Sequence, residues 1–288
     1  MNTQYIVSTD LDGTLLNHDD YQWEDAREAL MALSNYKIPM IINTSKTRSE
    51  VATLNSVLPI RDQSYVVENG SAIVLSNEDL IKLDRYKDHP KLKMMDSHYV
   101  WVLGEEREFL CHWLYALREK FNWKFEGYRD WDYQTIMAKT GLSLESAIES
   151  SKKEFSEPFE WNDTDENLSI LKTMAKQSGF EILKGGRFYH LQGNVNKSSL
   201  FDFIKEYQSI LYPGSKHIQF IALGDNDNDV HMLNRANYAI VIKSPVNAAP
   251  ILTKSSGVTH SRAMGAKGWN QEILTLLQSF KLIINKEN

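Results

Sequence analysis

Two short acidic segments hold the side chains of this 288-residue chain that are best suited to chemistry. Residues 10–14 read Asp-Leu-Asp-Gly-Thr, and residues 224–229 read Gly-Asp-Asn-Asp-Asn-Asp. Carboxylates that pack together repel one another unless a cation lies between them. Mg²⁺ suits a site that offers only oxygen ligands together with a substrate phosphate. The residue types therefore predict a Mg²⁺ site that includes Asp10 and Asp225.

The same side chains could also transfer a phosphoryl group. An aspartate can attack phosphorus and form an aspartyl-phosphate, and Asp10 is our candidate nucleophile. Asp12 could protonate the leaving oxygen and later activate water. The phosphoryl oxygens need positive or hydrogen-bonding partners, for which Thr44 and Lys197 are the candidates.

Two other structures are typical of such acidic segments. Either segment alone could be a solvated turn rich in Asp, Asn and Gly. An EF-hand calcium loop would need Gly at its sixth position and Glu at its twelfth. Counted from Asp225, these positions hold Val230 and Ala236, so the spacing excludes that loop.

The acidic segments each follow a predicted buried strand, and strands alternate with helices on both sides of them. This alternation predicts a parallel sheet, and ligands of such sheets bind beyond the carboxyl ends of the strands. We expect strands at residues 5–9, 39–43, 65–67, 218–223 and 238–242. Helices are expected from about residue 23 and at residues 49–58, 197–211 and 229–235.

The middle of the chain has a different pattern, with many aromatic residues and longer helices. We expect helices near residues 105–121 and 165–178, followed by strands near 180–183 and 188–191. The predicted fold class is α/β, with a doubly wound, Rossmann-like parallel-sheet core. The core would comprise residues 1–83 and 191–288, and residues 84–190 would form an inserted α+β domain.

The composition fits a soluble globular protein, with 42% hydrophobic and 24% charged residues. A net charge of −6 argues against a nucleic-acid partner. The sequence has neither a signal-peptide pattern nor an apolar run of about 20 residues, so we expect a cytoplasmic protein without membrane contact. A single cysteine, Cys111, excludes an internal disulfide and a cysteine-based metal site.

The ordered motifs resemble those of the haloacid dehalogenase superfamily. They are Asp10-x-Asp12-Gly13-Thr14, Thr44, Lys197 and Gly224-Asp225-x-x-Asn228-Asp229. The resemblance implies that Asp10 is nucleophile and metal ligand, and that Asp12 is general acid/base with its backbone carbonyl on Mg²⁺. It makes Thr44 and Lys197 the holders of the phosphoryl oxygens, Asp225 a further metal ligand, and Asn228 and Asp229 its supports. The inserted domain would be a C2-type cap.

A narrower resemblance, to the mannosyl-3-phosphoglycerate phosphatases, extends into the cap. It is carried by the runs Thr44-Ser45-Lys46-Thr47-Arg48, Glu68-Asn69-Gly70, Thr140-Gly141-Leu142-Ser143 and Arg187-Phe188-Tyr189-His190. It implies a phosphoric monoester hydrolase that converts mannosyl-3-phosphoglycerate to mannosylglycerate. The side chains implied to bind this small phosphorylated sugar are those of Ser45, Lys46, Asn69, Ser143, Arg187 and His190. An arginine can bind a glycerate carboxylate through two hydrogen bonds. Arg187 could instead be a surface charge, and His190 a structural histidine.

Other functions remained open on the sequence. A broad sugar-phosphate phosphatase, a glucosyl-3-phosphoglycerate phosphatase or a phosphomutase would share the scaffold. A phospho-aspartate signalling receiver also combines acidic residues, Thr and Lys, but it needs about half the length and has no carboxylate in the place of Asp12. Ion-pump ATPases also use an aspartate nucleophile, but they need membrane spans, and the sequence predicts none.

Overall fold

The protein is described by a computed structural model at residues 3–55, 58, 62–185 and 187–282. Its central sheet has five strands in the order β13-β12-β11-β1-β2, and all neighbouring pairs are parallel. The strands are β1 (Thr3–Thr9), β2 (Met40–Ile42), β11 (His217–Gly224), β12 (Tyr238–Lys243) and β13 (Val258–Met264). The expected parallel sheet is therefore present, and β13 is a strand that the sequence pattern did not reveal.

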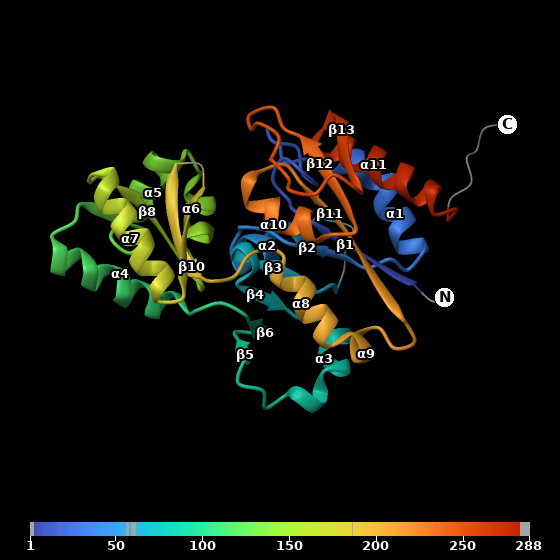
Figure 1. Cartoon of the computed structure of the whole chain (residues 1–288), viewed down its shortest axis with the longest axis horizontal. Helices are drawn as coiled ribbons and strands as arrows, with labels where there is room; N and C mark the ends of the chain where they lie inside the picture. The colour runs from blue at the N-terminus through green and yellow to red at the C-terminus, as the bar shows by residue number, and fades with distance from the viewer. Residues whose placement is uncertain (1–2, 56–57, 59–61, 186, 283–288) are drawn as a thin grey trace.

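Helices cover both faces of this sheet, as expected for a doubly wound fold (Figure 1). The core helices are α1 (Arg27–Asn35), α2 (Arg48–Asn55), α8 (Ser199–Glu206), α9 (Gln208–Leu211), α10 (Val230–Arg235) and α11 (Gly265–Ser279). Strand β1 shows why both faces are needed, because Val7 packs with α1 and α11 while Ile6 packs with α8 and α10. The alternating side chains of a strand point to opposite faces, so two apolar layers must be covered. Residues 56 and 57 of the helix expected at 49–58 lie outside the described residues.

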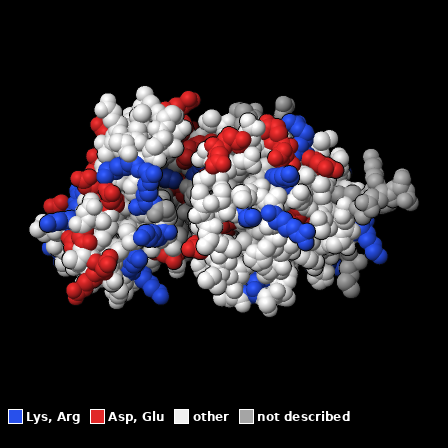
Figure 2. Space-filling model, turned by 90° about the horizontal axis from the view of Figure 1, so that it is seen from above, with Lys and Arg blue, Asp and Glu red and all other residues white. Residues whose placement is uncertain are grey.

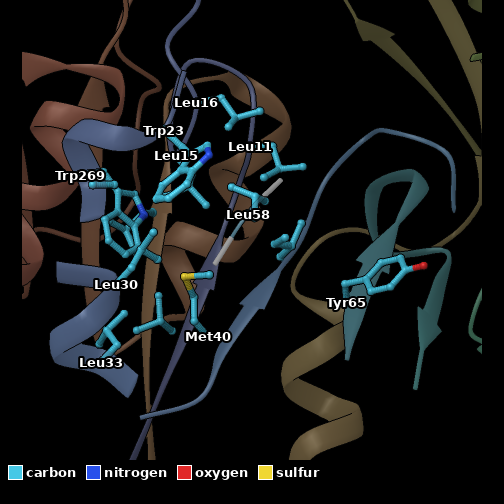
Figure 3. Close-up of a cluster of buried hydrophobic side chains, with 14 of the residues drawn as sticks. Leu11, Leu15, Leu16, Trp23, Leu30, Leu33, Met40, Leu58, Tyr65 and Trp269 are labelled. Carbon is cyan, nitrogen blue, oxygen red and sulfur yellow. The ribbon is translucent and has the colours of Figure 1, made fainter. Parts of the chain in front are cut away.

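The core beneath α1 and α11 contains a buried tryptophan that reaches the sheet. Trp269 lies beside Leu30 among the labelled side chains of this cluster (Figure 3). Its indole N–H donates to Thr9 Oγ1 at 3.0 Å, and the Thr9 hydroxyl donates to the Asp10 carbonyl at 2.8 Å. The last helix therefore supports the end of β1 through two consecutive hydrogen bonds.

A second sheet extends the core at the β2 edge, in the order β3-β4-β6-β5. Its elements are β3 (Tyr65–Val67), β4 (Ala72–Val74), β5 (Leu92–Met95) and β6 (His98–Val102), with α3 (Asn77–Lys82) between β4 and β5. Strand β3 lies where the sequence predicts it, but its ladder with β4 is antiparallel. Among the described residues, an isolated parallel bridge between Asn43 and Val66 joins β3 to the end of β2.

The remaining elements form a lobe at one side of the core, drawn at the left of Figure 1. Its antiparallel sheet has the order β7-β8-β10-β9. The elements are α4 (Arg107–Phe121), β7 (Phe125–Gly127), α5 (Tyr133–Thr140), α6 (Leu144–Ser151), β8 (Ser156–Trp161), α7 (Asp165–Gln177), β9 (Phe180–Gly185) and β10 (Phe188–Gly193). Helices α5, α6 and α7 begin at side-chain caps, supplied by Asp132, Ser143 and Thr164. The fold is thus a parallel α/β core with an inserted α+β cap.

The division of the chain at residues 84 and 190 stays a prediction, and we propose different junctions. Strands β5 and β6 continue the core sheet, and Trp101 of β6 packs on Phe203 and Tyr207 of the core. A Cβ atom on Gly193 would lie 2.9 Å from the backbone nitrogen of Glu105, so the two connecting segments run against each other. Gly193 and its neighbour across this contact, Gly104, are therefore our junctions.

Every helix among the described residues is too short or too polar to cross a membrane. The face shown in Figure 2 carries acidic and basic side chains interspersed over both lobes.

Candidate active site

The two acidic segments meet at the carboxyl edge of the central sheet. Thr9 at the end of β1 pairs with Leu223 of β11 on one side and with Ile42 of β2 on the other. The next residues continue this register, because the Asp10 N–H donates to the Leu223 carbonyl at 3.0 Å and the Asn43 N–H donates to the Thr9 carbonyl at 2.8 Å. Side chains after three parallel strands are therefore brought to one place, as the sequence predicts.

Lys197 is the cation at the centre of this edge. Its fully buried ammonium contacts Asp10 Oδ1 and Asp229 Oδ1, each at 2.6 Å. Burial acts to lower the pKa of Lys197, but the attraction of the two carboxylates outweighs it and raises the pKa. The chain is held here at both sides, since Asn43 Nδ2 donates to the Lys197 carbonyl at 2.7 Å and Asn196 Oδ1 accepts from Ser198 N at 2.9 Å. Lys197 therefore stays charged and fixed against the candidate nucleophile.

Asp229 organises the second acidic segment. Its Oδ2 atom accepts from the backbone N–H groups of Asp225 at 3.0 Å and Asn226 at 3.2 Å, while its Oδ1 atom binds Lys197. Burial raises the pKa of Asp229, and repulsion by Asp10 adds to the rise. Both oxygens are thus engaged with the protein, which fits the predicted supporting role better than direct metal ligation.

The carboxylates of Asp10, Asp225 and Asp229 converge, with one oxygen of each within 4.8 Å of the others. Burial raises the pKa of Asp225, and the nearby charge of Asp10 raises it further. Three buried carboxylates around a single lysine leave an excess of negative charge, and their oxygens are the ligands that Mg²⁺ prefers. The residues therefore fit a Mg²⁺ ion, and the assignment of Asp10 and Asp225 as its ligands stays a prediction.

Asp225 is held by residues from two other segments. Thr14 Oγ1 donates to its Oδ1 at 3.4 Å, and Asn247 Nδ2 donates to its Oδ2 at 3.3 Å. Gly13, with φ of +74°, leaves no room for a side chain, because a Cβ atom there would lie 2.8 Å from Asp225 Oδ2. The glycine of the first motif is therefore required by the carboxylate of the last.

Asp12 lies beside this cluster and forms an ion pair with Lys46, with Nζ and Oδ2 separated by 2.9 Å. Its Oδ1 atom is buried and has no hydrogen-bond partner among the described residues. Burial raises the pKa of Asp12, while the Lys46 ammonium acts to lower it. One oxygen is thus held and the other is free, which suits a group that exchanges a proton with substrate.

The loop after β2 carries the predicted phosphoryl-binding residues. Thr44 is fully buried, and its Oγ1 accepts from the Lys46 N–H at 3.2 Å. Ser45 meets the cap, because its carbonyl accepts from Lys153 Nζ at 3.0 Å. Asn69 and Asn228 contact each other, with Nδ2 of Asn228 donating to Oδ1 of Asn69 at 3.3 Å.

The cap residues named from the sequence have partners inside the cap. Ser143 caps α6 by accepting from the Ser146 N–H at 3.2 Å. Arg187 is exposed and donates to the Lys139 carbonyl at 2.6 Å. Their part in substrate binding stays a prediction.

His190 differs from these two because a lysine that contacts the core, Lys153, affects its pKa. Burial lowers the pKa of its imidazole, and the charge of Lys153 lowers it further. The same Lys153 ammonium donates to the Ser45 carbonyl of the core loop at 3.0 Å. The substrate contact predicted for His190 stays a prediction.

The sequence pattern does not indicate a role for three residues of this region. Lys153 follows a helix without any motif, and Asn247 lies in an irregular loop after β12. Thr14 is the last residue of the first motif, and its residue type alone does not predict a contact with Asp225. Of the three, only Asn247 had a signal in the sequence, because it lies in the loop after a predicted strand of the parallel sheet.

Comparison with known proteins gives a consistent family. The sequence model of haloacid dehalogenase-like hydrolases matches residues 7–261. The glucosyl-3-phosphoglycerate/mannosyl-3-phosphoglycerate phosphatase of Persephonella marina is 31% identical over 96% of this chain and 98% of that protein. The protein of the same name from Methanococcoides burtonii is 29% identical over 95% of this chain and 97% of that protein.

Solved structures share the fold at low sequence identity. A Streptococcus mutans protein superposes with a TM-score of 0.62 at 16% identity, covering 95% of this chain and 98% of that one. A Thermotoga maritima protein gives a TM-score of 0.61 at 15% identity, covering 98% of both chains. The chain belongs to the haloacid dehalogenase-like hydrolase family, and it is a phosphatase, a hydrolase of phosphoric monoesters.

Proposed function

We propose that this phosphatase is Mg²⁺-dependent, uses Asp10 as a covalent nucleophile, and acts on a glycosyl-3-phosphoglycerate, with mannosyl-3-phosphoglycerate as the first candidate. The observation that carries the mechanism is the arrangement around Asp10. Its carboxylate is bound at 2.6 Å by a buried lysine and lies within a cluster of three carboxylates. A carboxylate that is fixed and charged next to a phosphoryl site is what nucleophilic attack on phosphorus requires.

In the first half of the reaction, a carboxylate oxygen of Asp10 attacks phosphorus. An oxygen–phosphorus bond forms at Asp10 while the bond from phosphorus to the ester oxygen breaks, and the proton of Asp12 goes to that oxygen. In the second half, Asp12 takes a proton from water as the water oxygen attacks phosphorus. The bond to Asp10 then breaks, phosphate leaves, and both aspartates return to their starting states.

Other residues of the chain orient these groups. Lys197 holds Asp10 and, with Thr44, would bind phosphoryl oxygens. Asp10, Asp225 and the backbone carbonyl of Asp12 would hold Mg²⁺, which when bound would neutralise charge on the phosphoryl group.

Support for the substrate comes from the relatives and from basic side chains near the site. Both curated relatives are named for glucosyl- and mannosyl-3-phosphoglycerate, and they align over nearly the whole chain, cap included. Lys46 from the core pairs with Asp12, and Lys153 from the cap contacts the loop that carries Thr44. Figure 2 shows basic side chains reaching the boundary between the two lobes. A glycerate carboxylate next to the phosphate would be attracted to these ammonium groups.

The test is phosphate release from mannosyl- and glucosyl-3-phosphoglycerate and from unrelated sugar phosphates, with Mg²⁺ and after its removal by a chelator. We expect the two glycosyl esters to give the highest kcat/KM, and the chelator to abolish turnover. Asp10→Asn should be inactive but folded, and the exposed Asp19→Asn should match the wild type.

Quenched reactions of Asp12→Asn examined by intact mass should show the added phosphoryl group, because the second half of the reaction is slowed. Full turnover by Asp10→Asn would sink the mechanism. A flat substrate profile with an inactive Asp10→Asn would sink the substrate alone.

A further inference from the structure

The turn of residues 68–70 after β3 has an unusual backbone. Glu68, Asn69 and Gly70 have φ values of +47°, +58° and +95°. The left-handed region is common for glycine and uncommon for other residues, and least expected for a long side chain such as that of glutamate. Such a conformation persists where the surrounding contacts demand it.

The backbone of this turn holds the loop that carries Thr44. The Glu68 N–H donates to the Lys46 carbonyl at 3.0 Å, and the Asn69 N–H donates to the Thr44 carbonyl at 2.9 Å. Gly70 packs against the segment that precedes Lys197, since a Cβ atom there would lie 2.0 Å from the Asn196 carbonyl oxygen. The turn therefore contacts the backbone beside both predicted phosphoryl-binding residues.

The Glu68 side chain leaves the turn in the other direction, into the start of β8 in the cap. Oε1 accepts from the Glu154 N–H at 2.8 Å. Oε2 accepts from the Phe155 N–H at 3.3 Å and from the Ser156 hydroxyl at 2.5 Å. Glu68 is 1% exposed, so these hydrogen bonds are shielded from water. A buried carboxylate with three donors from one short segment fixes that segment firmly.

We propose that Glu68 is a positioning residue that couples the placement of the cap to the phosphoryl-binding loops of the core. The Glu68 side chain binds the segment that leads into β8 of the cap. The backbone N–H groups of the same turn hold the carbonyls of Thr44 and Lys46 in place. A shift of β8 would thus be transmitted to the loop that receives the phosphoryl group. The proposal needs only the phosphatase activity of the family and does not depend on which ester is the natural substrate.

Glu68→Gln is the test because it keeps the shape but turns one acceptor into an amide donor. That donor would face the N–H and O–H groups of the cap segment. We expect kcat for p-nitrophenyl phosphate to fall about tenfold or more, since misplacement by about 1 Å can cost 10²-fold. We also expect faster amide hydrogen exchange at residues 154–155 and at residues 68–69, measured on the whole chain with Mg²⁺ present. Ser156→Ala, which removes one donor and leaves Glu68 intact, should shift both readouts in the same direction by less.

A matched control is available within the cap. Glu157 is also fully buried, and it accepts from Arg107 Nε at 2.7 Å, from Tyr115 Oη at 3.0 Å and from the Arg129 N–H at 2.9 Å. All three donors belong to the cap, so Glu157→Gln should weaken the cap without altering the turn. We expect this variant to keep kcat within about twofold of the wild type and to leave exchange at residues 68–69 unchanged.

The outcomes separate coupling from simple structural support. The proposal is overturned if folded Glu68→Gln keeps the wild-type kcat, or if its faster exchange is confined to the cap. It is also overturned if Glu157→Gln lowers kcat as much as Glu68→Gln does. Should Glu68→Gln not fold, Ser156→Ala decides, and a wild-type result for both of its readouts overturns the proposal.

Discussion

The carboxyl edge of the core and the cap use their polar side chains in different ways. At the core edge, Lys197 and Asp10 are 187 residues apart in sequence, yet they meet at 2.6 Å and are almost fully buried. In the cap, the exposed Arg187 binds the backbone of a neighbouring helix, and Ser143 caps the helix that it precedes. The first kind of contact assembles the candidate active site, and the second kind maintains a local fold.

This difference follows from topology. Parallel strands deliver all of their carboxyl ends to one edge, so functional residues can be assigned from sequence once the strands are known. An antiparallel sheet such as that of the cap has carboxyl ends of strands at both edges, so the same reasoning does not select one side. Variants in the two regions should therefore differ strongly in effect.

The largest effect is expected for Lys197→Met. The change leaves Asp10 and Asp229 facing each other in a buried site without their shared cation, which should cost about 3–5 kcal/mol of unfolding free energy. Phosphatase activity should fall about 10³-fold, the order seen when a charge-stabilising donor is removed. Aryl phosphate kinetics and urea unfolding measure both effects. Lys172→Met, on the cap surface, is the control, and comparable losses in the two variants would erase the contrast between the regions.

A smaller effect is expected for Gly13→Ala, which tests how tightly the site is packed around Asp225. The new methyl group would lie 2.8 Å from Asp225 Oδ2, so the carboxylate must move. We expect the Mg²⁺ concentration for half-maximal activity to rise about tenfold, which corresponds to about 1.4 kcal/mol. We also expect a smaller rise in Tm on addition of Mg²⁺.

Gly141→Ala in the cap is the matched control. Its φ of +81° carries the same backbone cost, but its Cβ atom would meet nothing within 4 Å. This variant should lose stability without any change in the Mg²⁺ requirement. Equal shifts in the Mg²⁺ requirement of the two variants would show that backbone strain, and not the contact with Asp225, is the cause.

A third prediction concerns His190 of the cap, which should make the free energy of unfolding depend on pH. Burial lowers the pKa of His190, so the folded protein holds it neutral. The unfolded chain takes up a proton below about pH 6.5, and the stability that neutral His190 contributes is present above that pH. It is lost as the pH falls towards the folded pKa, by at most about 1.4 kcal/mol per unit.

Urea unfolding between pH 7 and pH 5 measures this loss. His190→Gln should flatten the slope, and His217→Gln, at an exposed position of β11, should not. An unchanged slope in His190→Gln would mean that the neutral imidazole contributes nothing to the pH dependence.

The smallest effect is expected for Arg187→Ala. Hydrolysis of p-nitrophenyl phosphate should stay within about twofold of the wild type, because the side chain is exposed and its contact is local. If Arg187 binds the glycerate carboxylate, KM for a glycosyl-3-phosphoglycerate should rise more than KM for the aryl ester. Equal changes in the two KM values would remove Arg187 from the substrate site.

The sequence predicted the core edge well for a physical reason. Asp10, Thr44 and Asp225 each follow a buried strand of a parallel sheet, and this alone brings their chain segments together. The sequence could not predict the placement of Lys153, because the contact with Ser45 depends on how the cap is docked. Nor could it reveal β13 and the antiparallel sheet of β3 to β6, whose short or half-exposed strands give weak periodic signals.

Turn residues 68–70 show a similar limit. The run Glu-Asn-Gly predicts a turn, but not that the glutamate is buried. The Glu68 carboxylate accepts from backbone N–H groups more than 80 residues away. Because every residue type except proline has such an N–H group, the sequence does not show which segment will supply it.

The link from Trp269 through Thr9 to the Asp10 carbonyl has a consequence for how this chain can be altered. The family model matches residues 7–261, yet the indole that donates to Thr9, next to Asp10, comes from α11, which begins after that stretch. That helix therefore supports the backbone of the Asp10 segment as well as the fold. Shortening α11, or fusing another protein through it, should therefore disturb the position of Asp10 although the change lies more than 250 residues away in sequence.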